Sequence, residues 1–165
     1  MVDVSRVALV AFDIDGTLTD ATTWWTGETT GWVQRYSIRD GEAILRMKTR
    51  LPVLPLSRNQ TTSAQQRMAM LGLDARWLGV RDKVGAIAEI CREYGMVPTQ
   101  ICVVGDGIDD ADVFGHVGLG CAVADAHPRA LTTAHLVLDA PGGARVMEEL
   151  EERLFGGESV GGGIR

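Results

Sequence analysis

The sequence predicts an α/β fold, a Rossmann-like three-layer α/β/α sandwich with a mostly parallel sheet. Two observations predict it: short continuous apolar runs alternate with amphipathic stretches, and polar residues gather directly after the apolar runs. A strand buried on both faces has a continuous apolar run, and strands that alternate with helices are typical of parallel sheets. The 165 residues suffice for one domain, which we expect to cover residues 1–155.

Each expected element has a local reason. Strands are expected where short apolar runs lie between turn residues, at 7–12, 51–56, 76–80, 101–105, 119–124 and 136–138. Helices are expected where amphipathic stretches follow capping residues or end near glycine, at 40–50, 61–73, 82–95, 109–117, 127–134 and 144–155. The Gly-rich segment 156–165 is expected to be a flexible tail.

A β-hairpin is expected at residues 21–38, directly after the first strand. The stretch "TWWTGETTGWVQRYSI" has two β-rich runs around the polar "TGETTG" and no helical period. A two-stranded hairpin is only marginally stable alone, and aromatic residues are enriched at protein interfaces. Trp24, Trp25 and Trp32 therefore indicate an oligomer interface, with hairpin packing as the alternative.

Composition excludes several classes of protein. The net charge is −6 and no Lys/Arg-rich run occurs, so nucleic acid is not an expected partner. No stretch approaches the length of a membrane span, and no long apolar segment resembles a signal peptide. The three cysteines fit neither a CxxC pair nor a zinc cluster and are expected to be buried free thiols. We therefore expect a cytoplasmic protein without a membrane partner.

Acidic residues follow two of the expected core strands. Asp13 and Asp15 come directly after 7–12, and Asp106 follows 101–105. Ligands of parallel α/β folds bind beyond the carboxyl ends of the strands, where these side chains would meet. Clustered carboxylates repel one another unless a cation joins them, and oxygen ligands suit Mg²⁺. Helix capping is the alternative for any one of these aspartates.

Four motifs in this order resemble the haloacid dehalogenase superfamily of phosphohydrolases. They are "DIDGTLTD" at 13–20, Ser57 in "PLSRNQ", Lys83 in "GVRDK" and "GDGIDD" at 105–110. The stretches "YSIRDGEAI", "VGDGIDDADVF" and "AVADAHP" are similar to its small cap-less branch, which hydrolyses phosphorylated 2-keto-3-deoxy sugar acids. The resemblance implies a hairpin after the first motif, no large cap domain, and a homotetramer formed through the hairpins.

The resemblance also implies a mechanism. Asp13 would attack phosphorus and form an aspartyl-phosphate, and Asp15 would act as general acid and then general base. Mg²⁺ would be bound by the Asp13 side chain, the Asp15 carbonyl and Asp106. Ser57 and Lys83 would hold the phosphoryl oxygens.

Further residues are assigned supporting or specificity roles. Thr17 is expected to help fix Asp15, and Asp109 and Asp110 are expected to support the metal ligands without binding the ion directly, with helix capping as the alternative for Asp109. Arg58 could bind a sugar carboxylate or be a solvated surface residue, and Asp40 could contact substrate or cap a helix.

The substrate is the open question of the sequence. "LSRNQ" departs from the patterns of both the 3-deoxy-D-manno-octulosonate 8-phosphate and the nonulosonate 9-phosphate enzymes. A phosphatase for another small sugar phosphate, or a non-catalytic oligomerisation module, are the alternatives.

Overall fold

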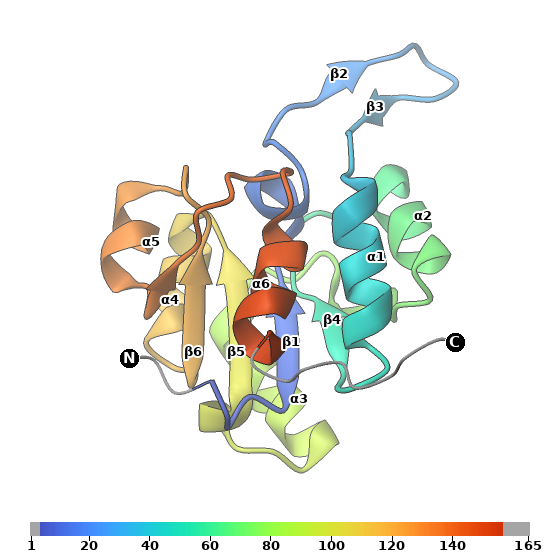
Figure 1. The fold of residues 1–165 in the computed structure, drawn as a ribbon. Coiled ribbons are helices and arrows are strands. Elements are labelled where there is room, and N and C mark those ends of the chain that lie inside the picture. Colours follow the sequence, from blue (N-terminus) through green and yellow to red (C-terminus); the bar gives the residue numbers. More distant parts are fainter. Residues whose placement is uncertain (1–3, 157–165) are drawn as a thin grey trace, which may run out of the picture.

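A five-stranded parallel sheet forms the centre of the computed structural model, which describes residues 4–156 (Figure 1). The strand order is β4-β1-β5-β6-β7. The strands are β1 (Leu9–Phe12), β4 (Val53–Pro55), β5 (Ile101–Gly105), β6 (Leu119–Ala122) and β7 (Leu136–Val137). The predicted α/β class is confirmed.

Helices cover both faces of the sheet. In Figure 1, α1 (Ile38–Met47) and α6 (Val146–Phe155) lie side by side in front of it, and α3 (Lys83–Tyr94) and α4 (Ile108–Phe114) lie behind it. The remaining helices are α2 (Thr62–Met70) and α5 (Pro128–Thr133), with the short turns η1 (Ile14–Leu18), η2 (Ala75–Trp77) and η3 (Pro98–Gln100). No large cap domain interrupts this arrangement in the described residues, as predicted.

The apolar runs form the core because both faces of the sheet are covered. Every residue of β1 and β5 is buried, including Phe12 between the helix layers. Burial of one large aliphatic or aromatic side chain contributes about 1.5–3 kcal/mol. Side-chain caps fix where helices begin: Ser37 accepts from the Asp40 N–H at 3.2 Å, so α1 begins earlier than the expected residue 40.

The expected strand at 76–80 is wrong. The Asp74 side chain accepts from the Arg76 N–H at 2.9 Å and caps the short turn η2 instead. Leu78 then makes a single parallel bridge with Ser57, and Gly79 leaves the extended conformation with φ +74°. The apolar character of this segment reflects the buried Trp77 ring rather than a strand of the sheet.

The predicted hairpin is confirmed. Strands β2 (Trp24–Trp25) and β3 (Trp32–Val33) pair antiparallel and project beyond the carboxyl ends of the sheet strands (Figure 1). The rings of Trp25 and Trp32 pack edge to face, with centroids 5.6 Å apart. Trp24, Trp25 and Trp32 are nevertheless 48%, 53% and 57% exposed. The hairpin has only two residues in each strand, and its tryptophans are largely uncovered within the chain.

Asp40 joins the two helices of the front layer. Its buried Oδ1 accepts from the backbone N–H groups of Met147, at 2.8 Å, and Glu148, at 3.4 Å, in the first turn of α6. The preceding Arg145 makes no side-chain cap, so Asp40 satisfies donors that would otherwise lack a partner. Burial raises the pKa of Asp40.

Three further expectations concern the cysteines, the membrane and the tail. Cys102 and Cys121 are buried free thiols with their Sγ atoms 3.9 Å apart, whereas Cys91 is only half-buried. Among residues 4–156, every helix is too short or too polar to span a bilayer. Beyond Gly156, the expected tail lies outside the described residues.

We predict that Asp40→Ala lowers the free energy of unfolding by about 1–3 kcal/mol, because it leaves the α6 N–H groups without an acceptor. Urea denaturation measures the change. Asp40→Asn retains an oxygen acceptor and should lose less. Glu42→Ala, on the exposed face of the same helix, is the control and should change stability by about 0.5 kcal/mol or less. Wild-type stability in Asp40→Ala would contradict the capping role.

Candidate active site

The predicted site residues gather where three neighbouring parallel strands end. Asp13 follows β1, Ser57 follows β4 and Asp106 follows β5, and these strands are adjacent in the order β4-β1-β5. A cavity of about 200 Å³ lies there. It is lined by Asp13, Asp15, Ser57, Arg58, Lys83, Asp106, Gly107, Ile108, Asp109 and Asp110. All the residues that the sequence nominated line this cavity except Asp40 and Thr17.

Lys83 is the cation inside this acidic cavity. Its Nζ lies 2.9 Å from Asp13 Oδ1 and 2.7 Å from Asp110 Oδ1, and the residue is only 4% exposed. It is the first residue of α3, whose start is fixed by Asp82 accepting from the Gly85 N–H at 2.8 Å. Burial works against the charged ammonium, but the charges of Asp13 and Asp110 outweigh it and raise the pKa of Lys83.

Asp110 is held by both of its carboxylate oxygens. While Oδ1 binds Lys83, Oδ2 accepts from the backbone N–H groups of Asp106 at 3.0 Å and Gly107 at 2.9 Å. This fold-back requires Gly105, because a Cβ there would lie 2.1 Å from the Asp110 Cγ. Asp110 therefore ties the end of β5 to α4 and orients Lys83, and both of its oxygens already have partners.

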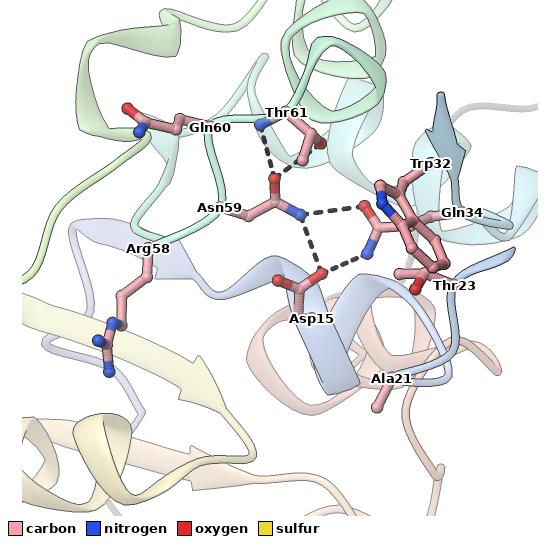
Figure 2. Close-up of a pocket in the computed structure, with 9 residues that line it drawn as sticks. All are labelled: Asp15, Ala21, Thr23, Trp32, Gln34, Arg58, Asn59, Gln60 and Thr61. Carbon is pink, nitrogen blue, oxygen red and sulfur yellow. Dashed lines mark hydrogen bonds between the residues drawn. The ribbon is translucent and has the colours of Figure 1, made fainter. Parts of the chain in front are cut away.

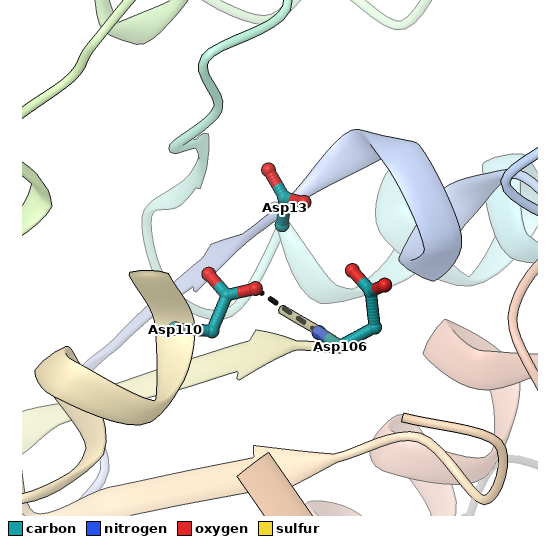
Figure 3. Close-up of side chains that lie close together, drawn as sticks. All are labelled: Asp13, Asp106 and Asp110. Atoms are coloured by element: carbon teal, nitrogen blue, oxygen red, sulfur yellow. Dashed lines mark hydrogen bonds between the residues drawn. The ribbon is translucent and has the colours of Figure 1, made fainter. Parts of the chain in front are cut away.

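Three carboxylates face one lysine, and the surplus of negative charge affects their ionisation. Oxygens of Asp13, Asp106 and Asp110 lie within 4.8 Å of one another (Figure 3). Burial raises the pKa of Asp13 to about 6, helped by the Asp110 charge and opposed by Lys83. Burial and the charges of Asp13 and Asp110 raise the pKa of Asp106 to about 7. An all-oxygen set with surplus negative charge fits a hard divalent cation.

Ser57 lies under the same cavity. It is buried, its N–H donates to the Trp77 carbonyl at 3.1 Å, and its hydroxyl hydrogen-bonds the Asp13 carboxylate. The Val80 N–H donates to the Ser57 carbonyl at 2.9 Å. Loop 77–80 thus fixes the backbone of Ser57, and the hydroxyl is placed beside Asp13.

The turn after β1 brings Asp15 to a different surface from Asp13. Gly16 has φ +83°, and a Cβ there would lie 2.1 Å from Asp106 Oδ2, so only glycine fits. Asp15 is exposed and lines a second cavity of about 670 Å³, together with Ala21, Thr23, Trp32, Gln34, Arg58, Asn59, Gln60 and Thr61 (Figure 2). Asp15 and Arg58 line both cavities, so the two spaces share a border.

Thr17 does not help to fix Asp15, which corrects the expectation. Its buried hydroxyl has no hydrogen-bond partner among the residues that the structure describes. Thr19 closes the turn instead: its N–H donates to the Ile14 carbonyl at 3.0 Å, and its hydroxyl accepts from the Gly16 N–H at 3.3 Å. The Thr17 carbonyl accepts from the Gly143 N–H at 2.9 Å, so Thr17 contributes to the packing of the turn through its backbone.

The positions of three further residues decide between the alternatives that the sequence left open. Asp40 lies away from both cavities and binds the start of α6, so the structure places it in the capping role. Asp109 does not cap α4, which begins after Gly107. Its Oδ2 instead accepts from Arg58 Nη1 at 3.0 Å across the rim of the small cavity. Arg58 is exposed but paired rather than simply solvated.

Sequence reasoning missed two residues that contact Asp15. Asn59 Nδ2 donates to Asp15 Oδ1 at 2.9 Å, and Gln34 Nε2 donates to the same oxygen. Asn59 belongs to the unusual "LSRNQ", which was a signal that this segment differs. Gln34 follows β3 in the hairpin, and nothing local in the sequence marks it.

Comparisons with known proteins agree with this geometry. The family model for haloacid dehalogenase-like hydrolases matches residues 80–142. A 3-deoxy-D-manno-octulosonate 8-phosphate phosphatase of Salmonella typhi is 27% identical over 156 residues, 94% of this chain and 82% of the relative.

Two solved structures are also similar. The crystal structure of the 3-deoxy-D-manno-octulosonate 8-phosphate phosphatase from Yersinia pestis has a TM-score of 0.84 at 27% identity, covering 92% of this chain and 82% of that one. The cobalt-bound deoxy-D-mannose-octulosonate 8-phosphate phosphatase from Haemophilus influenzae has a TM-score of 0.84 at 26% identity, covering 93% and 90%. The motifs and the sheet that brings them together agree with these comparisons: residues 80–142 match the haloacid dehalogenase-like hydrolase model, and nearly the whole chain is similar to octulosonate phosphatases.

Proposed function

We propose that this chain is a Mg²⁺-dependent phosphatase that hydrolyses a phosphomonoester of a 2-keto-3-deoxy sugar acid. The observation that carries the proposal is the buried Asp13, held by Lys83 at 2.9 Å in a cavity that Asp106 and Ser57 also line. A nucleophile beside fixed cationic and hydroxyl groups suits phosphoryl transfer, where positioning and charge stabilisation supply the rate enhancement. Residues 1–155 would act as one catalytic domain.

The cation is proposed to be held by the Asp13 side chain, the Asp15 backbone carbonyl and Asp106. Asp110 is not proposed as a ligand, because it orients Lys83 and binds two backbone N–H groups at the end of β5. Mg²⁺ is favoured because the donors are all hard oxygens, and the cobalt-bound relative supports a divalent ion. When bound, the ion neutralises charge on the phosphoryl oxygens.

Each step of the reaction is then assigned to residues of this chain. The Asp13 carboxylate attacks phosphorus, an Asp13–phosphorus bond forms, and the ester P–O bond breaks. Asp15 gives its proton to the departing alkoxide. In the second step Asp15 takes a proton from the water that attacks phosphorus, and Asp13 is released. Lys83 and Ser57 hold the phosphoryl oxygens, and Asp110 orients Lys83.

The size of the site supports a substrate that is larger than its phosphoryl group. The phosphoryl group fits the small cavity, and the rest of the molecule would occupy the cavity of about 670 Å³ beyond Asp15. Arg58 lies on the border of the two and would exchange Asp109 for the substrate carboxylate. The octulosonate phosphatases whose sequences align with 94% of this chain, at 27% identity, support this substrate class.

A panel of sugar phosphates with and without a carboxylate, assayed for phosphate release with Mg²⁺, tests the proposal. We expect the sugar-acid phosphates to be preferred. Asp13→Asn should lower turnover by on the order of 10³-fold or more while remaining folded. Arg58→Gln should raise KM for the acids about 10-fold and leave the neutral sugar phosphates unchanged, since a charged hydrogen bond is lost.

Arg92→Gln, on the exposed face of α3, is the matched control for Arg58. Preference for neutral sugar phosphates would contradict the sugar-acid assignment and favour a phosphatase for another small sugar phosphate. If the folded wild type released no phosphate from any member of the panel, the chain would be a non-catalytic module.

We also infer a homotetramer formed through hairpin 21–38, in the cytoplasm. The exposed Trp24, Trp25 and Trp32 support the assembly, and the free thiols suit a reducing compartment. Sedimentation velocity should give a tetramer. Replacing Trp24 and Trp25 by Ser should shift it toward smaller species, whereas Val97→Ser, an exposed apolar residue far from the hairpin in sequence, should not. A monomeric wild type would contradict the inference.

A further inference from the structure

Asp15 is held from one side by two amide groups. Its Oδ1 accepts from Asn59 Nδ2 at 2.9 Å and from Gln34 Nε2. Figure 2 shows the second oxygen pointing away from both amides, on the side of the view where Arg58 lies. Within residues 4–156, no hydrogen bond occupies that second oxygen. One oxygen is therefore anchored, and the other is available to carry a proton.

The orientation of both amides is fixed by their own oxygens. Asn59 Oδ1 accepts from the Thr61 N–H and hydroxyl, each at 2.8 Å. Gln34 Oε1 accepts from Asn59 Nδ2 at 3.0 Å and from the Tyr36 hydroxyl at 3.3 Å. An amide whose oxygen is engaged by donors must present its NH₂ group on the other side. Both NH₂ groups consequently face Asp15.

The two amide hydrogen bonds restrict rotation of the Asp15 carboxylate. The terminal torsion of an aspartate is broad, so an exposed carboxylate rotates readily. Two donors on one oxygen remove that rotation and hold the plane of the carboxylate. One donor comes from the segment after β4, where Asn59 is 9% exposed, and the other comes from the hairpin just after β3. The segment after β4 and the hairpin, which both line the larger cavity, thus both contact Asp15.

We propose that Gln34 and Asn59 are positioning residues that hold Asp15 for proton transfer to the leaving group, and that the hairpin thereby contributes to the chemical step. The inference rests on the proposed function, in which Asp15 is the general acid. It adds that the acid is aimed by these two amides, one of which is carried by the hairpin.

Leaving-group dependence tests this role in Gln34→Leu and Asn59→Leu. The substrates are p-nitrophenyl phosphate, whose phenolate departs without a proton, and the sugar phosphate that the wild type hydrolyses fastest. The value of kcat/KM reports the steps up to leaving-group departure, so the later hydrolysis of the aspartyl-phosphate does not enter it. A misplaced acid should therefore affect only the sugar phosphate.

We expect kcat/KM on the sugar phosphate to fall about 10- to 100-fold in each variant, part of the 10²–10⁴-fold that general acid catalysis supplies. On p-nitrophenyl phosphate it should fall less than about threefold, since no proton is required there. Asp15→Asn should show the same split more strongly. Gln66→Leu, exposed on α2, is the matched control and should behave as wild type on both substrates.

Equal losses on both substrates would overturn the inference, because a general disturbance of the site does not distinguish leaving groups. Unchanged rates on both would also overturn it. Gln34 lies on the hairpin outside the sheet core, so Gln34→Leu tests the positioning role even if Asn59→Leu does not fold. Failure of the proposed function is distinguishable, because the wild type itself would then release no phosphate.

Discussion

The site depends on one buried interaction, the pairing of Lys83 with Asp13 and Asp110. A lysine that is 4% exposed is tolerated only because its ammonium group lies 2.9 Å and 2.7 Å from two carboxylates. The three residues come from the end of β1, the start of α3 and the first turn of α4. Removing Lys83 would leave two buried carboxylates without their counter-charge. The same contact that orders Asp13, the proposed nucleophile, therefore also joins three elements of the fold.

Close backbone approaches permit this arrangement. Gly105 lets Asp110 fold back, and Gly16 lets Asp106 lie against the turn after β1. Behind that turn, a Cβ at Gly142 would lie 2.1 Å from the Gly16 carbonyl oxygen. The segment before α6 thus packs directly against the turn, while Asp40 holds the start of α6. Glycines and a helix cap that are distant in sequence together fix where the carboxylates of the candidate site lie.

The sequence predicted the parts that depend on local pattern and missed those that depend on tertiary contact. Apolar runs followed by Asp13, Asp106 and Ser57 located the sheet and the site, because parallel strands present their carboxyl ends together. Gln34 could not be found, since its role arises only when the hairpin reaches Asp15. The misassigned strand at 76–80 had strand-like composition, but the Asp74 cap and the buried Trp77 determine its conformation.

Charge balance decides what the site holds: three carboxylates face one lysine, and the surplus negative charge is offset either by protons on Asp13 and Asp106 or by a bound cation. With pKa values raised to about 6 for Asp13 and about 7 for Asp106, the folded metal-free protein holds these protons more tightly than the unfolded chain. The contribution of these two groups to the free energy of unfolding should therefore fall as pH rises from about 4 to about 7. Cation binding needs both groups ionised, so it should strengthen over the same range. The direct measurement is the increase in Tm caused by Mg²⁺ as a function of pH. We predict that this increase grows from about pH 5 to about pH 8 and loses most of its pH dependence in Asp106→Asn. An increase that is absent, or equal at every pH, would contradict the account.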